Sequence, residues 1–541
     1  MAFSEYDFDA FYAQCESVRL GLPPTHPLAV QQWNAIIALN YPARAYGLSR
    51  GMSAVDAKIR CPDLTLQHVA TWREGEPRWA YRENPMQCWK DDKAALDPYR
   101  RESRKAFALI SECLEGGPVA RIEKASVDEV FIDLSAKVYD TLKKKFLELR
   151  SAMKAPDDQV LPLPTNTELC WEASNLAGPP TAVTDWDDVA FNIGAEMVLD
   201  IRNEIYQGLC YTTSAGLAPN KLLAKLAAGY KKPNAQTVVL PSGIHTFLSP
   251  IEYPKLRGMA RQLGEKCQTA FGGSTVSDLK RIPLHTLCSK LGSEQGSFVF
   301  RSMRGVDTSE VVPRLRPKSM LSQKTFVPLV KNLDEASRWL RMFAVELNDR
   351  VLELDTKTSR RRPRVCKVSH HINGRFGPTR SKQTTLSPAS VFSEVAVYDC
   401  SLDLLCQLTT ETEEPSWPCL ALGVVISDFV ELGRPNGALR NFFKVTPAKR
   451  KHDPQDPTTQ PLKDIPAATE EVELETNPRW LDETDDEWSA VDLQESSNRH
   501  ESSTAVKYKC PHCDLLISGD GGAVLEHLDW HVAADMQSSL T

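Results

Sequence analysis

Apolar and polar positions alternate along this chain in short blocks, and their spacing predicts strands and helices in succession. Strands are predicted wherever β-favouring apolar residues cluster over four to ten positions, at residues 29–33, 36–39, 125–134, 209–215 and 421–426. Helices are predicted from apolar residues three and four positions apart, at residues 93–118 and 186–207. A chain of 541 residues with this alternation predicts an α/β protein of three to five domains.

Two adjacent carboxylates, Asp128 and Glu129, interrupt the predicted strand 125–134. Neighbours on a strand point to opposite faces, so these two share a face only where the chain bends or a cation draws them together. Carboxylates held close repel each other, and burying them is costly. A divalent cation removes that cost, and Mg²⁺ suits carboxylate, water and phosphate ligands. A surface Asp-Glu pair is the alternative, since the same dipeptide recurs at residues 334–335, 482–483 and 486–487.

A third carboxylate, Asp7, lies where a short strand is expected to turn into a helix. Asp9 follows two residues later and is a candidate N-cap for a helix that starts at Ala10. Asp7, Asp128 and Glu129 together could bind two cations about 3.5–4 Å apart, as polymerases and nucleases do. The sequence therefore predicts a two-metal site.

Basic and phenolic side chains recur at helical spacing, which suits phosphate binding. Tyr41 and Arg44 are three residues apart and would share one face of a helical turn, although an exposed Arg is the alternative. Lys221 and Lys225 follow Pro219, a favourable helix start, and they are either functional or simply solvated. Paired glycines within residues 255–264 predict a helical hairpin.

Charge is distributed unevenly along the chain, whose net charge is −7. Residues 453–500 carry 14 Asp and Glu against 3 Lys and Arg, which predicts a disordered acidic linker. Residues 313–452 carry 23 Lys and Arg against 14 acids, and residues 357–382 hold nine bases and no acid. A strand pattern runs through that basic segment, so a surface that follows nucleic-acid phosphates is favoured over a nuclear-import patch.

Four Cys and His residues near the C-terminus have the spacing of a zinc finger. Cys510 and Cys513 are followed by His527 and His531, and four N and S ligands complete a tetrahedron around Zn²⁺. His512 is a rival ligand but lies between the two cysteines. A lone finger with an acidic helix argues against DNA reading.

Bulk composition excludes a membrane span and argues against disulfides. No apolar run reaches about 18 residues, and no signal peptide is evident. Fourteen cysteines are scattered without a repeat, which favours reduced thiols in a cytosolic or nuclear protein.

Three stretches of the sequence resemble one family. They are Asp7-x-Asp9-x-Phe11-Tyr12, Ser126-x-Asp128-Glu129, and the run 214–227 with 231–234. Together they resemble the palm of a Y-family translesion DNA polymerase, and the wider match is closest to the eta type. The resemblance covers residues 7 to about 445 and 508–535.

The resemblance implies a right-hand polymerase of the α/β multidomain class, with a mixed or antiparallel palm sheet, small fingers, a helical thumb, an α/β little finger and a small ββα zinc finger. The implied domains are palm 1–14 and 93–236, fingers 15–92, thumb 237–312, little finger 313–448, acidic linker 449–504 and zinc finger 505–541. The family has an apolar strand before its first Asp. Only residues 1–6 precede Asp7 here, as in a truncated start, so we expect a weakly stabilised first strand.

The resemblance also implies the roles of single residues. Two Mg²⁺ ions would be held by Asp7, Asp128, Glu129 and the Phe8 carbonyl, and Zn²⁺ by the finger. Tyr12 would stack under the deoxyribose and exclude a 2′-hydroxyl. The implied nucleotide-binding residues are Phe8, Phe11, Tyr12, Gln32, Tyr41, Arg44, Arg50 and Lys232, with Gln31 as a competitor for Gln32. The implied DNA-binding residues are Arg360, Arg361, Arg362 and Arg364.

The implied partners are primer–template DNA, deoxynucleoside triphosphates, and ubiquitin or a ubiquitinated sliding clamp, with no membrane. Asp529 and Ala533 would contact ubiquitin, and residues 436–443 resemble a clamp-binding peptide, with core packing nearly as good an interpretation. We expect a monomeric nuclear enzyme for translesion synthesis past UV-type lesions. Two other classes stay open, a two-metal nuclease or cyclase and a non-catalytic zinc adaptor.

Overall fold

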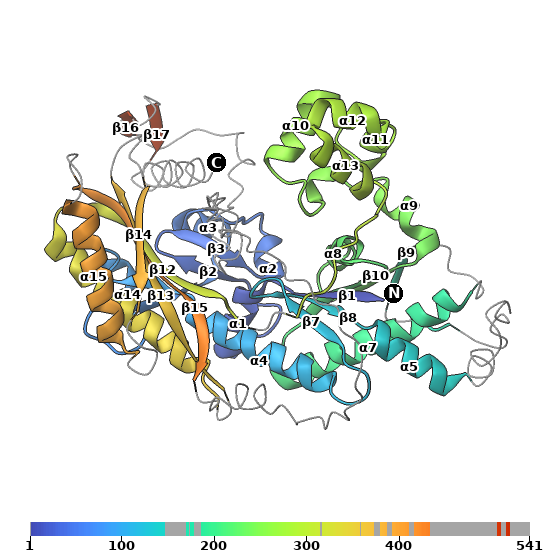
Figure 1. Ribbon diagram of the computed structural model, residues 1–541, viewed down its shortest axis with the longest axis horizontal. Helices are drawn as coiled ribbons and strands as arrows, with labels where there is room; N and C mark the ends of the chain where they lie inside the picture. Colours follow the sequence, from blue (N-terminus) through green and yellow to red (C-terminus); the bar gives the residue numbers. More distant parts are fainter. Residues whose placement is uncertain are drawn as a thin grey trace, which may run out of the picture. The chain divides into compact units, whose positions relative to one another are not determined.

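The computed structural model describes residues 2–146, 169–171, 174–177, 185–313, 316–356, 359–372, 379–386, 392–410, 416–432, 506–509 and 516–519. The chain forms two compact units, and the boundary between them lies between Pro317 and Lys318. Both combine helices with sheets (Figure 1), so the expected mixed α/β class is confirmed.

A six-stranded sheet forms the centre of the first unit. Its order is β7 (Arg121–Lys124), β8 (Glu129–Asp133), β1 (Phe3–Phe8), β10 (Thr213–Ala218), β11 (Gln236–Val239) and β9 (Asn175–Ala177). β1 pairs antiparallel with both β8 and β10, while β10–β11 and β11–β9 are parallel. The short first strand is thus a central strand with a partner on each side.

Side chains alternate between the two faces of this sheet. Tyr6, Phe8, Val130 and Ile132 are buried with residues of α4 (Asp97–Cys113) and α7 (Trp186–Leu209). α5 (Ser135–Lys145) also contacts α7. This face holds the largest apolar core of the unit, because burial of apolar surface drives the helices onto it.

The opposite face of the sheet is covered by α8 (Lys221–Gly229), which contacts β1, β10 and β11. Asn220 caps α8 by accepting a hydrogen bond from the Leu223 N–H. At Gly216 an added Cβ would lie 2.1 Å from the Ala224 carbonyl oxygen, so only glycine allows α8 this close to β10. Lysines of α8 consequently reach the side chains that β1 and β8 project from this face.

Two small sheets lie between α1 (Phe11–Arg19) and α4 in the sequence. One has the order β3 (Ala35–Leu39), β2 (Leu28–Gln32), β4 (Thr65–His68), and the other pairs β5 (Ala70–Trp72) with β6 (Lys93–Ala95). The short helices α2 (Tyr41–Arg44) and α3 (Ala54–Arg60), and a 3₁₀ turn at Pro85–Gln87, complete the region. The predicted strand pair and the helical turn at Tyr41 are confirmed.

A helical cluster follows β11. Its α-helices are α9 (Ile244–Leu248), α10 (Gln262–Phe271), α11 (Val276–Lys280), α12 (Leu284–Leu291) and α13 (Ser293–Ser302), with 3₁₀ turns at Pro241–Gly243 and Tyr253–Lys255. The cluster shares a buried core with α8, which includes Leu222, Leu223 and Met303. In place of the helical hairpin expected within residues 255–264, the structure has the end of the 3₁₀ turn Tyr253–Lys255 and the start of α10 at Gln262.

The second unit is a four-stranded antiparallel sheet with two helices. The strand order is β12 (Ser319–Val330), β15 (Cys419–Leu432), β13 (Arg360–Ile372), β14 (Thr379–Thr385). Residues of α14 (Leu333–Glu353) and α15 (Glu394–Thr410) share a core with Cys366, Val368, Val424 and Ile426. The strand pattern predicted through the basic segment is therefore confirmed. β16 (Val506–Lys509) and β17 (Leu516–Gly519) form a separate hairpin.

Three predicted element bounds need correction. The strand expected at 209–215 is β10, Thr213–Ala218, because α7 continues to Leu209 and Cys210 ends it in a left-handed conformation. The helix expected at 93–118 is α4, Asp97–Cys113, since residues 93–95 form β6. The strand predicted at 125–134 is β8, Glu129–Asp133, because residues 126–128 form a bend.

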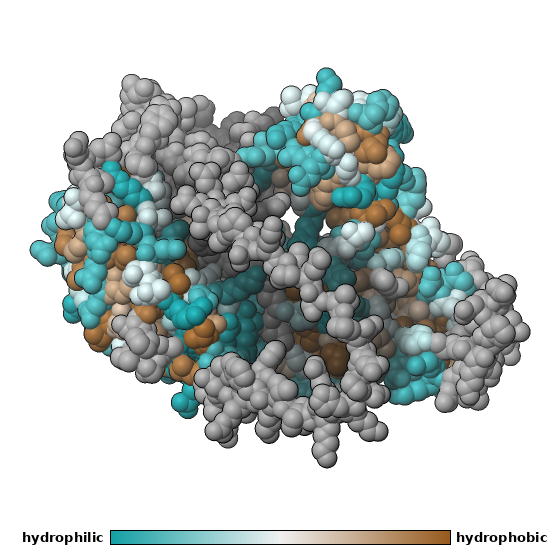
Figure 2. Space-filling model, in the orientation of Figure 1, coloured by the Kyte–Doolittle hydropathy of each residue, from teal (hydrophilic) through white to brown (hydrophobic). Residues whose placement is uncertain are grey.

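The visible face of the molecule mixes hydrophilic with hydrophobic residues over both units (Figure 2). In the described part of the chain, no helix combines the length and hydrophobicity that a bilayer crossing requires.

Candidate active site

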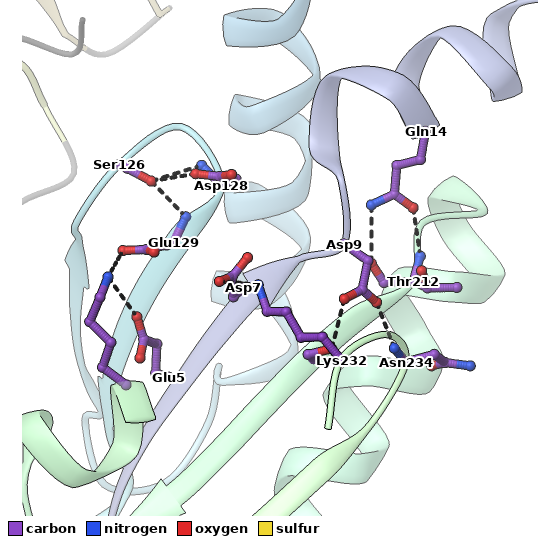
Figure 3. A network of polar contacts seen from close by, with 12 residues as sticks. Glu5, Asp7, Asp9, Gln14, Ser126, Asp128, Glu129, Thr212, Lys232 and Asn234 are labelled. Atoms are coloured by element: carbon purple, nitrogen blue, oxygen red, sulfur yellow. Dashed lines mark hydrogen bonds and ion pairs between the residues drawn. The ribbon is translucent and has the colours of Figure 1, made fainter. Parts of the chain in front are cut away.

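Asp7 and Glu129 are direct partners across the β1–β8 ladder. Directly opposed residues project from the same face of a sheet, here the face that α8 covers. Asp128 lies in the bend before β8, and its backbone carbonyl accepts a hydrogen bond of 3.0 Å from the Phe8 N–H. The bend is what frees Asp128 from strict alternation, so all three predicted carboxylates lie near one another (Figure 3).

Ser126 holds this bend together. Its Oγ donates to Asp128 Oδ1 at 2.5 Å and accepts from the Asp128 and Glu129 N–H groups at 3.2 and 3.0 Å. One hydroxyl therefore fixes both the backbone and one carboxylate of the predicted pair, which explains why a serine two residues before Asp128 suits this turn.

Two lysine ammonium groups balance the carboxylates. Lys232 is ion-paired with Asp7, and Lys225 is ion-paired with Glu129. Lys225 Nζ also lies 3.7 Å from Glu5 Oε1, a carboxylate two residues before Asp7 on the same face of β1. The interpretation of Lys225 as a merely solvated lysine is wrong, and so is that of Lys221, which is 3% exposed and bonded to Glu123 at 2.7 and 2.8 Å.

Burial shifts the pKa of these groups. It raises the pKa of Asp7 to about 7, against the lowering effect of Lys232. It also raises the pKa of Asp128, although the hydrogen bond from Ser126 lowers it. Burial raises the pKa of Glu5 well above its ordinary value, and the charge of Lys225 only partly opposes this. A cluster of desolvated carboxylates with raised pKa values is typical of a functional site.

The donor set fits Mg²⁺ in chemistry, because desolvated carboxylate oxygens are the ligands that this ion prefers. In the part of the chain that the structure describes, no three Asp, Glu, His or Cys side chains are grouped as metal ligands. Ammonium groups neutralise Asp7 and Glu129 instead. A divalent cation at these carboxylates would therefore compete with Lys232 and Lys225 for them.

Asp9 does not cap α1, contrary to the prediction. The helix begins at Phe11, and Ala10 precedes it in a left-handed conformation without a side-chain cap. The Asp9 carboxylate instead accepts from Ser214 Oγ at 2.7 Å and from the Asn234 N–H at 2.8 Å. Asp9 thus ties β10 and the loop that carries Lys232 to the end of β1, as Figure 3 shows.

Tyr41 and Arg44 share one face of α2, as predicted, with the guanidinium carbon 4.7 Å from the centre of the Tyr41 ring. Burial raises the pKa of Tyr41, and the charges of Asp9 and Asp7 add to the rise.

The other residues expected to bind nucleotide differ in exposure. Phe8 and Phe11 are buried, with ring centres 5.4 Å apart, whereas Tyr12 and Gln32 are partly exposed and Arg50 is exposed. The side chain of Gln31 is bonded to the Trp33 carbonyl. The side chain of Gln31, the alternative to Gln32 for contact with the base pair, is therefore occupied by a bond within the chain.

Two of the four arginines expected to contact DNA hold ion pairs inside the second unit. Arg362 is 9% exposed and makes two bonds to Asp355, at 2.7 and 2.8 Å. Arg364 bonds Asp428 at 2.5 and 2.9 Å. Arg360 is exposed and Arg361 is partly buried.

Several predictions for the part of the chain beyond residue 435 fall on residues outside the described part of the structure. They are the linker 453–500, the clamp-like peptide 436–443, the zinc ligands Cys510, Cys513, His527 and His531, and the ubiquitin contacts Asp529 and Ala533. The hairpin β16–β17 brackets the two cysteines in the sequence.

Sequence reasoning missed Glu5 and a buried cluster around Glu16. Glu16 accepts from Tyr99 and Tyr81 hydroxyls at 2.8 Å each. A charged residue inside the short strand before Asp7 was the available signal for Glu5, because charges are rare at strand positions that face a core.

Three family models match the chain. A model described as the impB/mucB/samB family matches residues 6–229, and one described as the C-terminal domain of the same family matches 317–439. A model described as a ubiquitin-binding zinc finger matches 506–539. The first two together cover more than half of the chain.

Curated relatives match over much of the chain. N-acetyltransferase eso1 of Schizosaccharomyces pombe is 35% identical over 450 residues, which are 81% of this chain and 49% of the relative. DNA polymerase eta of Saccharomyces cerevisiae is 35% identical over 45% of this chain and 42% of the relative. DNA polymerase eta of Arabidopsis thaliana is 30% identical, covering 64% and 49%. The chain spans about half the length of these relatives.

Proposed function

Because the chain belongs to the impB/mucB/samB family, with relatives named DNA polymerase eta, iota and IV, we propose that it is a Y-family DNA-directed DNA polymerase. The observation that carries the proposal is the cross-strand pairing of Asp7 with Glu129, beside Asp128 in its Ser126-held bend. The name of the eso1 relative includes an acetyltransferase, which we do not transfer to a chain that spans 49% of it.

In this proposal Asp7, Asp128, Glu129 and the Phe8 carbonyl hold two Mg²⁺ ions. When bound, such ions lower the pKa of the primer 3′-hydroxyl and neutralise the charge that develops on the triphosphate. Asp7 and Asp128 must lose their protons to act as ligands, and their raised pKa values make a nearby cation the natural counter-charge.

Lys232, the lysine that pairs with Asp7, would bind the nucleotide. Lys232 pairs with Asp7, so it lies beside the atoms where a triphosphate would be held. We assign Lys232, Arg44 and Tyr41 to the triphosphate, since phosphoryl transfer depends mainly on positioning and charge neutralisation. Gln32 and Arg50 are assigned to the nascent base pair, and Phe11 and Tyr12 to the sugar.

The second unit is assigned to the DNA backbone. It is the region where the sequence carries its excess of Lys and Arg, and Arg360 lies exposed at the start of β13. Counterion release would make its contribution strongly salt-dependent.

Primer extension tests the proposed activity. The full chain is incubated with Mg²⁺, all four deoxynucleotides and a primer annealed to an undamaged template or to one that contains a thymine dimer. We expect template-directed extension on both, which would also support translesion synthesis past UV-type lesions. Primer shortening without extension would identify a nuclease and overturn the proposal.

Recruitment is assigned to the zinc finger, with Cys510, Cys513, His527 and His531 as Zn²⁺ ligands and ubiquitin, free or on a sliding clamp, as the partner. The match of residues 506–539 to a ubiquitin-binding zinc finger supports this assignment. A segment of about 35 residues needs a metal to fold, because its apolar core is small. Nuclear localisation and a monomeric state complete the proposal.

Ubiquitin titration of the full chain tests the recruitment. Asp529→Ala should weaken binding and leave bound zinc unchanged, since Asp529 is not among the assigned ligands. Cys513→Ala should lose both zinc and ubiquitin. Ubiquitin binding that persists in Cys513→Ala would show that the finger is not the binding site.

A further inference from the structure

Two adjacent rows of side chains lie on the face of the six-stranded sheet that α8 covers. Glu5 of β1 and Glu123 of β7 are both direct partners of Phe131 on β8, so the three form one row across the strands. Asp7 and Glu129 form the next row. Glu5 and Glu129 are therefore diagonal neighbours across the β1–β8 ladder, and one long side chain can reach both.

Two lysines one turn apart on α8 divide the carboxylates of these rows. Lys221 is buried and bonds Glu123 at 2.7 and 2.8 Å. Lys225 is ion-paired with Glu129, and its Nζ also lies 3.7 Å from Oε1 of Glu5 (Figure 3). Lys225 is thus the lysine that lies between the carboxylates of both rows.

Glu5 is a carboxyl group whose bonding potential the fold leaves unused. Its side chain is fully buried, and among the described residues neither of its oxygens has a hydrogen-bond partner. A buried polar group in this state destabilises a fold, so its presence calls for a reason other than packing. Its position beside Lys225 supplies one, because an unused acceptor is available when the lysine changes partner.

The proposed metal site requires such a change of partner. Glu129 is assigned there as a ligand of Mg²⁺, so it has to leave Lys225 when the site fills. Lys232 has to leave Asp7 in the same way, and for it the triphosphate supplies new negative charge. Lys225 already has the carboxyl group of Glu5 within 3.7 Å. An ammonium group without a counter-charge would hold Glu129 back and would repel the cation.

We propose that Glu5 is a positioning residue for the metal site, because it takes over the Lys225 ammonium group when Glu129 turns to the cation. Glu129 is thereby released from an ion pair that would otherwise compete with Mg²⁺. This role rests on the proposed polymerase function and concerns how readily the site fills with Mg²⁺. Glu5 acts through Lys225 and is not itself a ligand.

Loss of the Glu5 carboxylate should weaken Mg²⁺ binding for two reasons. Before the cation binds, Lys225 would no longer be shared and would pair more tightly with Glu129. After the cation binds, Lys225 would lack a counter-charge. The side chain of Lys225 is 36% exposed, so solvent screens both effects, and we expect a change of about three- to tenfold in affinity.

Calorimetric Mg²⁺ titration of the full chain, without DNA or nucleotide, measures this affinity. Glu5→Leu removes the acceptor, whereas Glu5→Gln keeps its size and one acceptor oxygen without the charge. Glu123→Gln is the matched control, since it removes a carboxylate from the same row and from the other lysine of α8. We expect Glu5→Leu to bind Mg²⁺ about three- to tenfold more weakly than the parent. Glu5→Gln should lie between the two, and Glu123→Gln should match the parent.

Primer extension and thermal unfolding separate this role from a structural one. In Glu5→Leu the Mg²⁺ concentration that gives half the maximal rate should rise by the same factor as the dissociation constant. The kcat at saturating Mg²⁺ should stay at the parental value, because Glu5 is not a ligand, and the melting temperature without Mg²⁺ should not fall. A variant that loses kcat and melting temperature together would show a merely structural role and overturn the proposal.

A lysine variant tests whether Glu5 acts through Lys225. Lys225→Met removes the ammonium group and keeps an unbranched side chain, so it should bind Mg²⁺ more tightly than the parent. In that background Glu5→Leu should change the Mg²⁺ affinity much less than it does in the parent, because the two residues act as a pair. An equal loss in both backgrounds would show that Glu5 acts on the cation directly, which contradicts the proposal.

Two failures are distinguishable. A parent chain that binds no Mg²⁺ and adds no deoxynucleotide overturns the proposed function. A parent that does both, with a Glu5→Leu variant of parental Mg²⁺ affinity, overturns the role of Glu5 and leaves the polymerase intact. If Glu5→Leu does not fold, a Glu5→Gln variant with parental Mg²⁺ affinity overturns that role in the same way.

Discussion

Glu5 and Asp7 project from the same face of β1, and each carboxylate lies against a different lysine. Asp7 is ion-paired with Lys232, while Glu5 lies 3.7 Å from Lys225, whose shorter contact is with Glu129. Glu5 is fully buried, and neither of its side-chain oxygens has a hydrogen-bond partner among the described residues. The face that we assign to catalysis thus contains more carboxyl groups than its two lysines can pair closely.

The first prediction concerns stability. Burial raises the pKa of Glu5, so the native state binds this proton more tightly than the unfolded state does. The native state is favoured most at pH values below the pKa of Glu5 in the unfolded chain. This advantage is lost as pH rises through the pKa of Glu5 in the native state. We therefore expect Glu5→Leu to stabilise the chain at pH 8 by about 1–3 kcal/mol, the cost of a buried polar group without a hydrogen bond, since Lys225 keeps its shorter contact with Glu129.

Denaturant unfolding at pH 5 and pH 8 checks this. The gain in unfolding free energy should shrink at pH 5. A Glu5→Leu variant less stable than the parent at pH 8 would show that the Glu5–Lys225 contact stabilises the fold. Glu252→Leu, at an exposed surface ion pair with Lys255, is a control for loss of a carboxylate and should change stability little.

The second prediction concerns pH and magnesium. With a pKa of about 7, Asp7 is mostly protonated at pH 6 and mostly ionised at pH 8. Protons then compete with the cation, so the apparent Mg²⁺ affinity should rise by up to about tenfold per pH unit below pH 7 and level off above it. Calorimetric Mg²⁺ titration of the full chain at pH 6, 7 and 8 measures this, and an affinity independent of pH would contradict the assignment of Asp7 as a ligand.

The third prediction concerns the anchor of the Lys232 loop. Asp9→Ala removes the acceptor for Ser214 Oγ and the Asn234 N–H, and leaving the buried Ser214 hydroxyl unpaired costs about 1–3 kcal/mol. Asn234 is exposed, so water can replace its lost partner. We expect a lower melting temperature and a raised KM for deoxynucleotides, because Lys232 would no longer be held beside Asp7. Ser214→Ala removes only one of the two bonds and should show a smaller effect on both. An unchanged KM in Asp9→Ala would separate the anchor from nucleotide binding.

The fourth prediction divides the arginines of β13 by their contacts. Arg362→Ala should destabilise the second unit, because it breaks a two-bond ion pair with Asp355. Arg360→Ala should leave stability unchanged and reduce the slope of log K against log salt for DNA binding by up to about 0.9, one phosphate contact. Fluorescence anisotropy with labelled duplex DNA at several salt concentrations measures the slope. An unchanged slope for Arg360→Ala would place the DNA path elsewhere.

Local patterns in the sequence were enough to predict several strands and three carboxylates of the acidic cluster. The strand that follows Asp128, the paired strands at 29–39 and the turn at Tyr41 depend on residues close in sequence, so propensity and spacing suffice. The carboxylates were recognisable because charges inside an apolar strand are costly without a partner.

Contacts between distant residues were not predictable from one sequence. Asp9 has the spacing of a helix cap, yet Ser214 and Asn234, more than 200 residues away, take its carboxylate. The rings of Tyr12 and Tyr99 stack on each other. The two residues belong to different helices, so no rule of sequence spacing predicts this contact. Arg362 is one of three consecutive arginines, and only the register of β13 decides that this one turns inward to Asp355.

The catalytic role of the Asp128–Glu129 pair is tested by single-turnover nucleotide addition with the parent and with the double variant Asp128→Ala with Glu129→Ala. Both proteins are first shown to bind the same primer–template by anisotropy, which the basic second unit should preserve. We expect Mg²⁺-dependent extension by the parent and none measurable by the double variant at equal DNA occupancy. Extension by the double variant at the parental rate would contradict the assignment of these carboxylates as the catalytic centre.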